Sequence, residues 1–296
     1  MKISEILKKK ATISFEVFPP KSKNANLASL YKTIVELADL NPDFISVTYG
    51  AAGSEKGRTA EIASKIKNDF GIESVAHLTC ISSKKEEVLE VCQELRDNHV
   101  ENILALRGDY PKNKEVKEEE LDFCYGSDLV KFIHENFDGA FCVSGACYPD
   151  IHEEARNLQE DLLALKKKVE AGAEYLITQI FYNNQYYYRL VKEARKIGIN
   201  VPIIAGIMPV TNAKSLKNNA KMCGCSVPYE LSTMVEKYYE YPEAIKEIGI
   251  NYATHQIIDL ITNGVDGIHI YTMNRPEIAK SIFAGIPTVL RELNHA

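Results

Sequence analysis

Hydrophobic residues along this chain follow two alternating patterns. Short apolar runs, typical of strands buried on both faces, recur from one end of the chain to the other. They predict strands at residues 12–17, 44–48, 73–78, 102–106, 140–144, 175–178, 202–205 and 267–271. Between them, apolar residues spaced three or four apart predict helices. The expected helices are residues 27–40, 59–69, 84–98, 127–135, 153–171, 185–197, 213–221, 229–239, 241–262 and 276–283, after a short lysine-rich amphipathic helix within residues 1–10.

Strands and helices therefore alternate, which predicts parallel strands joined by right-handed crossovers. Eight strands is the number that closes a (β/α)8 (TIM) barrel. We predict this α/β fold for residues 1–296 as one domain, with extra helices between the seventh and eighth strands. A doubly wound open sheet is the alternative, although no Pro-, Gly- or Ser-rich linker divides the chain. The long connection 108–126 is expected to be a solvated lid.

Composition limits the possible partners and the compartment. Of the 296 residues, 45% are hydrophobic and 26% are charged, and the net charge of −6 argues against a nucleic-acid partner. The longest apolar run, 201–210, is too short to span a bilayer. No secretory leader opens the sequence, so we expect a cytoplasmic protein without a membrane partner.

Seven cysteines, an odd number, are expected to be reduced thiols. Cys223 and Cys225 lack the two-residue spacing of a redox or zinc pair, and no histidine lies nearby at ligand spacing. We therefore expect no metal site.

Polar side chains gather where the predicted strands end. In a parallel barrel these ends share one face, and active sites are built there. The residues placed at this face are Glu16, Thr48, Tyr49, His77, Arg107, Asp109, Ala146, Tyr148, Gln179 and Tyr271. Each has an ordinary explanation, such as a loop carboxylate or a core histidine. Together they predict a ligand, because polar groups are rarely buried without partners.

The segment 150–172 predicts an informative helix. Asp150 and Glu153 resemble a capping box, and Gly172 follows the expected end. Asp161 and Lys168 lie two turns apart on one edge of the helix. They either pair with each other or stay solvated, or they provide a carboxylate for sugar hydroxyls and an ammonium for phosphate. The sequence contains no G-x-G-x-x-G, P-loop or G-x-S-x-G motif, so a nucleotide is not bound by those devices.

Several sequence blocks, in family order and covering nearly the whole chain, resemble the methylenetetrahydrofolate reductases. They are SFEVFPP (14–20), FISVTYGA (44–51), AHLTC (76–80), LRGDYP (106–111), ACYPDIH (146–152), DLLALKKKVEAGA (161–173), ITQIFY (177–182) and YTMNR (271–275). The length is similar to that of the short bacterial form. This resemblance implies a (β/α)8 barrel holding FAD at its C-terminal face. It also implies reduction of 5,10-methylenetetrahydrofolate to 5-methyltetrahydrofolate with electrons from NAD(P)H, by ping-pong kinetics, in the one-carbon metabolism that supplies methionine. A homo-oligomer is expected.

The resemblance also implies residue roles. Glu16 is the expected general acid that opens the methylene bridge, and Asp109 is expected near the flavin pyrimidine edge and the pterin. Gln179 and Arg275 are expected to contact substrate. The residues expected to hold FAD, together with Asp109, are Thr48, Tyr49, Ala51, His77, Arg107, Gly108, Gly126, Tyr148, His152, Ala155, Asp161, Ala164, Lys167 and Lys168.

The chain departs from the family pattern at four of its positions. Ala164 and Lys167 stand where relatives often have Asn and Arg, and they are aligned with FAD-binding positions. Ser215 and Asn219 stand where relatives carry a Gln and an aromatic residue that touch substrate. These departures bear on substrate packing and on the choice between NADH and NADPH, and some relatives draw electrons through a partner subunit.

Elementary chemistry agrees with two of these roles. A carboxylate beside the flavin N1 edge opposes the negative charge that a reduced flavin carries there. A glutamate has a reference pKa of about 4.3, so a general acid at Glu16 needs surroundings that raise it. The apolar neighbours expected to do so are Phe15, Phe18, Pro19 and Pro20. Three alternatives stay open: another flavin barrel similar to proline dehydrogenase, a barrel lyase or epimerase without flavin, and a non-catalytic folate-binding protein.

Overall fold

The eight predicted strands form a closed barrel in the computed structural model, which describes residues 1–20, 26–49, 56–81, 83–110 and 121–293. Each strand pairs in parallel with the next one along the chain, and β8 closes the barrel on β1. The strands are β1 (Thr12–Val17), β2 (Phe44–Val47), β3 (Glu73–Thr79), β4 (Asn102–Leu106), β5 (Cys142–Cys147), β6 (Tyr175–Thr178), β7 (Ile203–Ile207) and β8 (Gly267–Tyr271). The (β/α)8 prediction is confirmed, and the open-sheet alternative is wrong.

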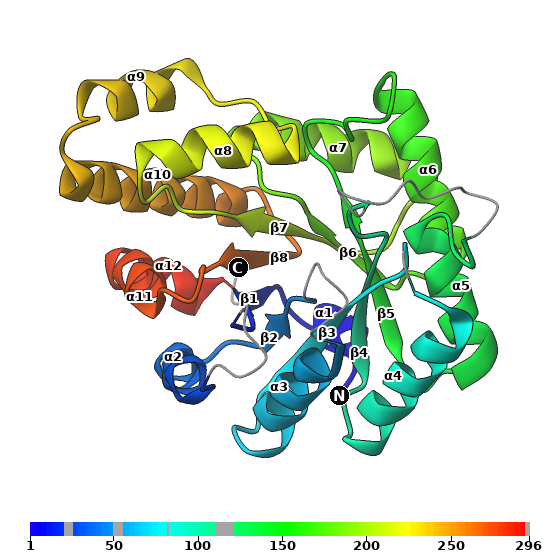
Figure 1. The fold of residues 1–296 in the computed structure, drawn as a ribbon. Coiled ribbons are helices and arrows are strands. Elements are labelled where there is room, and N and C mark those ends of the chain that lie inside the picture. Colours follow the sequence, from blue (N-terminus) through cyan, green and yellow to red (C-terminus); the bar gives the residue numbers. More distant parts are fainter. Residues whose placement is uncertain (21–25, 50–55, 82, 111–120, 294–296) are drawn as a thin grey trace.

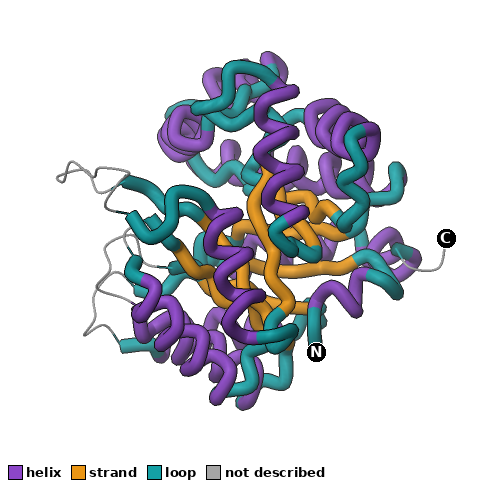
Figure 2. The backbone as a smooth tube through the Cα atoms, turned by 90° about the vertical axis from the view of Figure 1, so that its right-hand side faces the viewer, coloured by secondary structure: helices purple, strands orange, loops and turns teal. Residues whose placement is uncertain are grey.

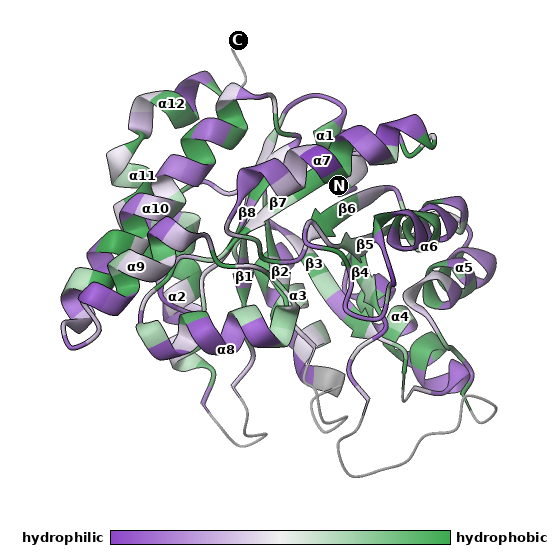
Figure 3. Ribbon diagram, turned by 90° about the horizontal axis from the view of Figure 1, so that it is seen from above, coloured by the Kyte–Doolittle hydropathy of each residue, from purple (hydrophilic) through white to green (hydrophobic). Residues whose placement is uncertain are grey.

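Helices surround the barrel on its outside, and Figure 2 shows the strands enclosed by them. They are α1 (Ile3–Leu7), α2 (Ala28–Ala38), α3 (Lys56–Asn68), α4 (Lys85–Asp97), α5 (Gly126–Phe137), α6 (Leu158–Glu170), α7 (Asn184–Lys196), α8 (Ala213–Cys223), α9 (Tyr229–Lys237), α10 (Pro242–Thr262), α11 (Pro276–Gly285) and α12 (Pro287–Glu292). Helices around the barrel carry both hydrophobic and hydrophilic stretches, as expected of elements with one face on a core (Figure 3). Within the described residues, no helix is both long and apolar enough to cross a membrane.

Two hydrophobic layers follow from the alternation of side chains along each strand. Phe15 and Val17 of β1 belong to the layer between strands and helices. Phe44 and Tyr175 belong to the inner layer, which fills the barrel interior from its N-terminal end. Helix α1 joins this inner layer through Ile3, whose backbone N–H donates to the side chain of Asn102 at 2.8 Å. The N-terminal end of the barrel is therefore plugged, and the opposite end is left for a site.

The predicted extra helices between β7 and β8 are α8, α9 and α10, which lie together beside those two strands (Figure 1). They enclose a second apolar cluster that includes Val210, Leu216 and Leu231. Helix α10 approaches the chain after β7 very closely at Gly249. A Cβ atom there would lie 1.7 Å from the carbonyl oxygen of Val210, so only glycine fits.

Some predicted boundaries need correction. Strand β5 starts and ends later than the predicted 140–144, and it includes the small residues Gly145 and Ala146. Helix α6 starts at Leu158, because Asn157 is the true N-cap and accepts a hydrogen bond from the N–H of Glu160 at 3.0 Å. The Asp150 capping box is therefore wrong.

Smaller corrections concern the other ends. Strand β7 continues to Ile207, and helix α12 was not predicted. Residues 111–120 of the expected lid lie outside the described residues.

Candidate functional site

A cavity of about 770 Å³ lies at the carboxyl ends of the strands, where the sequence places the polar residues. All ten residues expected at the strand exits line it. The lining also includes the expected Phe18, Gly108 and His152, and other residues that were not expected: Thr79, Ile81, Ser83, Leu104, Leu106, Glu153, Ile177, Thr178, Met222 and Cys223. The volume is within the range of small-molecule sites.

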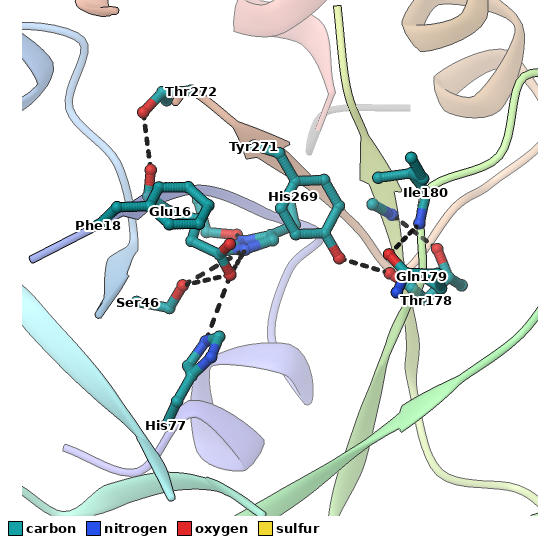
Figure 4. Close-up of polar contacts among 12 residues, drawn as sticks. Glu16, Phe18, Ser46, His77, Thr178, Gln179, Ile180, His269, Tyr271 and Thr272 are labelled. Atoms are coloured by element: carbon teal, nitrogen blue, oxygen red, sulfur yellow. Dashed lines mark hydrogen bonds and ion pairs between the residues drawn. The ribbon is translucent and has the colours of Figure 1, made fainter. Parts of the chain in front are cut away.

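Glu16 lies buried at the base of the cavity, with its carboxylate directed into a polar cluster (Figure 4). Its Oε2 atom lies 3.3 Å from His77 Nε2 and 3.6 Å from His269 Nε2. Ser46 donates a hydrogen bond to the same oxygen at 3.4 Å. These partners come from β2, β3 and β8, so the barrel ladder holds the carboxylate among three different strands. Two histidines beside one buried carboxylate form an arrangement that can hold and pass a proton.

His77 is kept uncharged mainly by its burial. Burial lowers the pKa of His77, Glu16 works in the opposite direction, and His269 adds to the lowering. The Nε2 atom of His77 has no hydrogen-bond partner among the described residues, and its contact with Glu16 lacks hydrogen-bond geometry. A buried polar atom without a partner at a cavity wall is available to a ligand.

His269 was not expected from the sequence. Its Nδ1 lies 2.8 Å from Ser14 Oγ, and its ring stacks on Phe44 at 5.9 Å. A signal existed, because Tyr271 was expected to face the site and His269 is two residues before it on the same face of β8.

The expected apolar neighbours of Glu16 are only partly correct. Phe15 points to the outside of the barrel, where its ring lies 5.6 Å from that of Phe283. It alternates with Glu16 along the strand and so cannot contact the carboxylate. Phe18 does line the cavity, whereas Pro19 and Pro20 do not. Figure 4 shows Phe18 beside Glu16.

Hydrogen bonds between the segments that follow β1 and β8 fix the backbone around Glu16. Thr272 donates to the carbonyl oxygen of Glu16 at 2.7 Å, and the Asn274 side chain bonds both backbone polar groups of Phe18. Across the cavity, the Tyr271 hydroxyl donates to the carbonyl oxygen of Thr178 at 2.7 Å. Glycine at position 206 permits this reach, since a Cβ atom there would lie 2.8 Å from the Tyr271 oxygen.

The exit of β4 places a cation, a glycine and a carboxylate on the wall. The guanidinium of Arg107 donates two hydrogen bonds, at 2.6 and 2.8 Å, to the carboxylate of Glu154. These bonds are the main cause that lowers the pKa of Glu154. Gly108 has φ of +82°, and a Cβ atom there would lie 3.0 Å from Thr79. Asp109 follows at the mouth and is exposed.

The exit of β5 supplies two aromatic side chains. The rings of Tyr148 and His152 meet edge to face at 4.5 Å, and burial raises the pKa of Tyr148 to about 12. The backbone N–H of His152 donates to Asp161 Oδ2 at 3.0 Å, and that of Ala155 donates to the carbonyl of His152 at 2.9 Å. Burial is the main cause that raises the pKa of Asp161.

Lys168 reaches the same region from α6. Its ammonium donates to the carbonyl oxygen of Ala146, and its stem covers Gly145, where a Cβ atom would lie 2.3 Å from Lys168 Cδ. Burial lowers the pKa of Lys168, while Cys147 and Asp161 oppose that change. Asp161 and Lys168 thus bond to the backbone at the exit of β5.

Of the remaining expected residues that the structure describes, all but Gln179 lie outside the cavity lining. Ala164 and Lys167 are exposed on α6, and Gly126 is buried against the backbone of β4. Asn212 caps α8 by accepting from the N–H of Ser215, whose hydroxyl donates to the carbonyl of Asn212. Asn219 donates to Met208 Sδ at 2.9 Å. Arg275 bonds Glu277 at 3.0 Å. Gln179 does line the cavity, and its side-chain oxygen accepts from the N–H of Ile180. Ala51 lies outside the described residues.

Metal ligation finds no support in the described part of the chain. No three His, Cys, Asp or Glu side chains come together there in a way that could hold an ion. The seven cysteines are free thiols, and burial raises the pKa of Cys225 to about 12 and that of Cys223 to about 11.

Fold and site together define a parallel α/β-barrel protein with a ligand-sized cavity at the carboxyl ends of its strands and a buried carboxylate at the cavity base. The family model described as methylenetetrahydrofolate reductase matches residues 2–287, and the chain belongs to this family. It is 37% identical, over 276 residues, to a 5,10-methylenetetrahydrofolate reductase from Pectobacterium carotovorum, with 93% of this chain and 90% of that protein covered.

A plant relative and a solved structure show how far the similarity extends. The chain is 35% identical to methylenetetrahydrofolate reductase (NADH) 1 of Arabidopsis thaliana over 92% of its length, and it spans about half of that protein, 48%. A solved structure of an uncharacterized Clostridium thermocellum protein, which binds two copies of 5-methyl-5,6,7,8-tetrahydrofolic acid, has a TM-score of 0.64 and 17% identity. It covers 98% of this chain and 99% of its own, and at that identity it shows the shared fold.

Proposed function

We propose that the protein reduces 5,10-methylenetetrahydrofolate to 5-methyltetrahydrofolate, with FAD as cofactor and NAD(P)H as electron donor. Membership of the reductase family supports this proposal, and so does the name of the Pectobacterium relative that it covers almost completely. The observation that carries it is the buried Glu16 carboxylate at the base of the cavity, beside His77 and His269. A reduction that opens a carbon–nitrogen bond needs a proton source at such a position.

The residues around the cavity suit FAD in shape and in chemistry. Gly108 lies on the lining and has no side chain, so a flat ring or a phosphate can approach its backbone, whereas the stem of Lys168 covers Gly145. Thr48, Tyr148 and His152 offer hydrogen-bonding groups on the lining, and Arg107 offers a cation there. Lys168 lies outside the lining, with its ammonium on the carbonyl of Ala146. The unpartnered Nε2 of His77 is a further polar atom at the wall. When bound, FAD would supply hydride transfer between the two substrates.

Glu16 has a defined task in this proposal. Its proton goes to the amine nitrogen that leaves when the methylene bridge opens to an iminium, and the electron pair of the broken C–N bond stays on that nitrogen. Ser46 donates a hydrogen bond to the carboxyl group, and the rings of His77 and His269 lie beside it. A fixed donor at hydrogen-bond reach of the nitrogen lowers the barrier for that step.

Substrate recognition is assigned to residues at the mouth. Asp109 is exposed there and its carboxylate can accept hydrogen bonds from a pterin, since Arg107 pairs with Glu154 instead. Gln179 adds an amide on the wall. One cavity for both substrates agrees with ping-pong kinetics. The roles of Ser215, Asn219 and Arg275 stay predictions, as do the choice between NADH and NADPH and the homo-oligomeric state.

An anaerobic two-step experiment tests the proposal. Purified protein should carry FAD, NADH or NADPH should bleach its absorbance, and methylenetetrahydrofolate should restore it with formation of 5-methyltetrahydrofolate. The fold neighbour that binds 5-methyltetrahydrofolic acid favours one competing function, a folate-binding protein without catalysis. Folate binding without any change in flavin absorbance would support that alternative and refute the reductase.

A further inference from the structure

Two segments far apart in the sequence meet beside the cavity mouth. Oδ1 of Asp150, in the loop between β5 and α6, accepts hydrogen bonds from both the N–H and the hydroxyl of Ser226, at 2.9 and 2.6 Å. Ser226 follows α8, and neither residue lines the cavity. This Asp150–Ser226 contact joins two walls of the site, because each segment carries lining residues.

The first wall is the loop after β5, which contributes Tyr148 and His152 to the lining. The second wall is the last turn of α8, which contributes Met222 and Cys223. The two walls are close to each other. The pKa of the Cys223 thiol is raised chiefly by burial, with smaller contributions from Asp109 and from Glu153 of the β5–α6 loop. The contacts that hold the end of α8 therefore set the distance between the two walls at the cavity mouth.

The chain after Cys223 is held at two successive points. Gly224 ends α8 with φ of +63°, and Cys225 is buried in the second apolar cluster, its N–H donating to the carbonyl of Ala220 at 3.1 Å. Ser226 then meets Asp150. The cluster fixes this segment to α9 and α10, whereas the Asp150–Ser226 contact fixes it to the opposite wall.

The loop that carries Asp150 is held in an unfavourable conformation. Ile151 has φ of +82°, which is rare for a β-branched residue. The second oxygen of Asp150, Oδ2, is buried without a hydrogen-bond partner among the described residues. Arg189 braces the loop from α7 by donating to the carbonyl of Pro149 at 3.2 Å. Such costs persist only where surrounding contacts impose them, and they cluster at functional sites.

From these observations we infer that Asp150 and Ser226 are positioning residues, which hold Met222 and Cys223 as the substrate-facing wall of the cavity. The thioether and thiol present a polarizable apolar surface, which suits the flat ring of a nicotinamide or a pterin. The substrate part of this inference rests on the proposed function. The positional part does not, because it concerns how two segments of the chain are held together.

The positional part is tested by chemical labelling of the purified full-length protein. Cys223 lines the cavity and is partly buried, so iodoacetamide should label it faster when the mouth is wider. Cys124, which is also partly buried, serves as an internal reference. Ser226→Ala removes the hydroxyl donor, so the labelling rate of Cys223 should rise about tenfold, as expected for loss of one hydrogen bond to a charged group. Ser226→Thr should retain the wild-type rate. Ser232→Ala, at an exposed serine of α9, is the matched control.

Labelling is read by mass spectrometry of the two cysteine peptides. A Cys223 rate in Ser226→Ala equal to that of wild type would overturn the positional role. Equal acceleration of Cys223 and Cys124 would also overturn it, because that result means general loosening of the fold.

The substrate part is tested by steady-state kinetics of the flavin-loaded enzyme. Ser226→Ala should raise KM for both substrates several-fold, with unchanged FAD content and melting temperature. Met222→Ala should raise KM similarly, and the double variant should be no worse than the worse single variant, because both changes remove the same wall. Additive effects, or an unchanged KM with faster labelling, would refute the wall assignment. A wild-type protein without reductase activity would instead refute the proposed function, and the labelling result would still decide the positional role.

Discussion

Replacing Glu16 by Gln separates catalysis from structure at the base of the cavity. The amide has nearly the same size as the carboxyl group, and its oxygen can still accept from Ser46, but it cannot deliver a proton. If Glu16 is the acid that opens the methylene bridge, it has no task when NAD(P)H donates electrons, because that step is a direct hydride transfer. We therefore expect the two half-reactions to respond very differently.

The magnitudes follow from the contacts of the carboxylate. Its three neighbours lie at 3.3, 3.4 and 3.6 Å, all longer than the distance of a strong hydrogen bond. Replacing the carboxyl group by an amide should therefore change the free energy of unfolding by about 1 kcal/mol or less. General acid catalysis contributes about 10²–10⁴-fold, which is a loss of about 2.7–5.4 kcal/mol in the barrier of the folate half-reaction. The kinetic effect should exceed the structural effect severalfold.

The assay is anaerobic stopped-flow absorbance on protein with a full complement of FAD. In Glu16→Gln, oxidation by methylenetetrahydrofolate should slow by at least two orders of magnitude, and reduction by NAD(P)H should change little. A melting curve of the same sample checks that the fold is retained. Equal slowing of both half-reactions, or a folate half-reaction near the wild-type rate, would refute the reasoning.

Three further changes test other parts of the structure. Lys168→Met should weaken FAD binding by about 10- to 100-fold in an equilibrium titration; Lys166→Met, on the exposed side of the same helix, should not. Gly249→Ala should lower the free energy of unfolding by about 1–3 kcal/mol in urea, because the new methyl group collides with a backbone carbonyl; Gly285→Ala, with 3.8 Å to its nearest neighbour, is its control. Burial lowers the pKa of His77 in the folded protein, so the unfolded chain binds a proton at this histidine more readily. The free energy of unfolding should therefore fall as the pH drops below about 6.5, and it should fall less in His77→Gln.

The strands were predictable because a barrel strand is buried on both faces, so that its apolar run is visible without any tertiary information. Strand β5 shows where this reasoning fails. The apolar run at 140–143 suggested an early strand, but the strand continues through Gly145 and Ala146, which have low strand propensity. Gly145 is small because the stem of Lys168 lies over it. Residue choice there is set by a helix that follows later in the chain.

The site residues that could be predicted are those that follow directly from where each strand ends. Glu16 and Tyr271 were placed by counting along their strands. The same count by two residues from Tyr271 would have found His269, since alternate residues face the interior. Asp150 shows the limit of such counting, because its carboxylate resembled a helix cap and instead bonds Ser226. A contact between segments 76 residues apart leaves no local pattern.

Chemistry and specificity are carried by different kinds of structure in this barrel. Glu16 and its partners Ser46, His77 and His269 stand on strands that pair with one another or with a common neighbour, so none can move without breaking ladder hydrogen bonds. The α8 wall belongs to the helices inserted between β7 and β8, which pack on a separate apolar cluster. Changes in that insertion can therefore alter which ring the mouth accepts while the position of the acid stays fixed. Because of this separation, substitutions on α8, which carries Ser215 and Asn219, should leave the carboxylate at the base of the cavity in place.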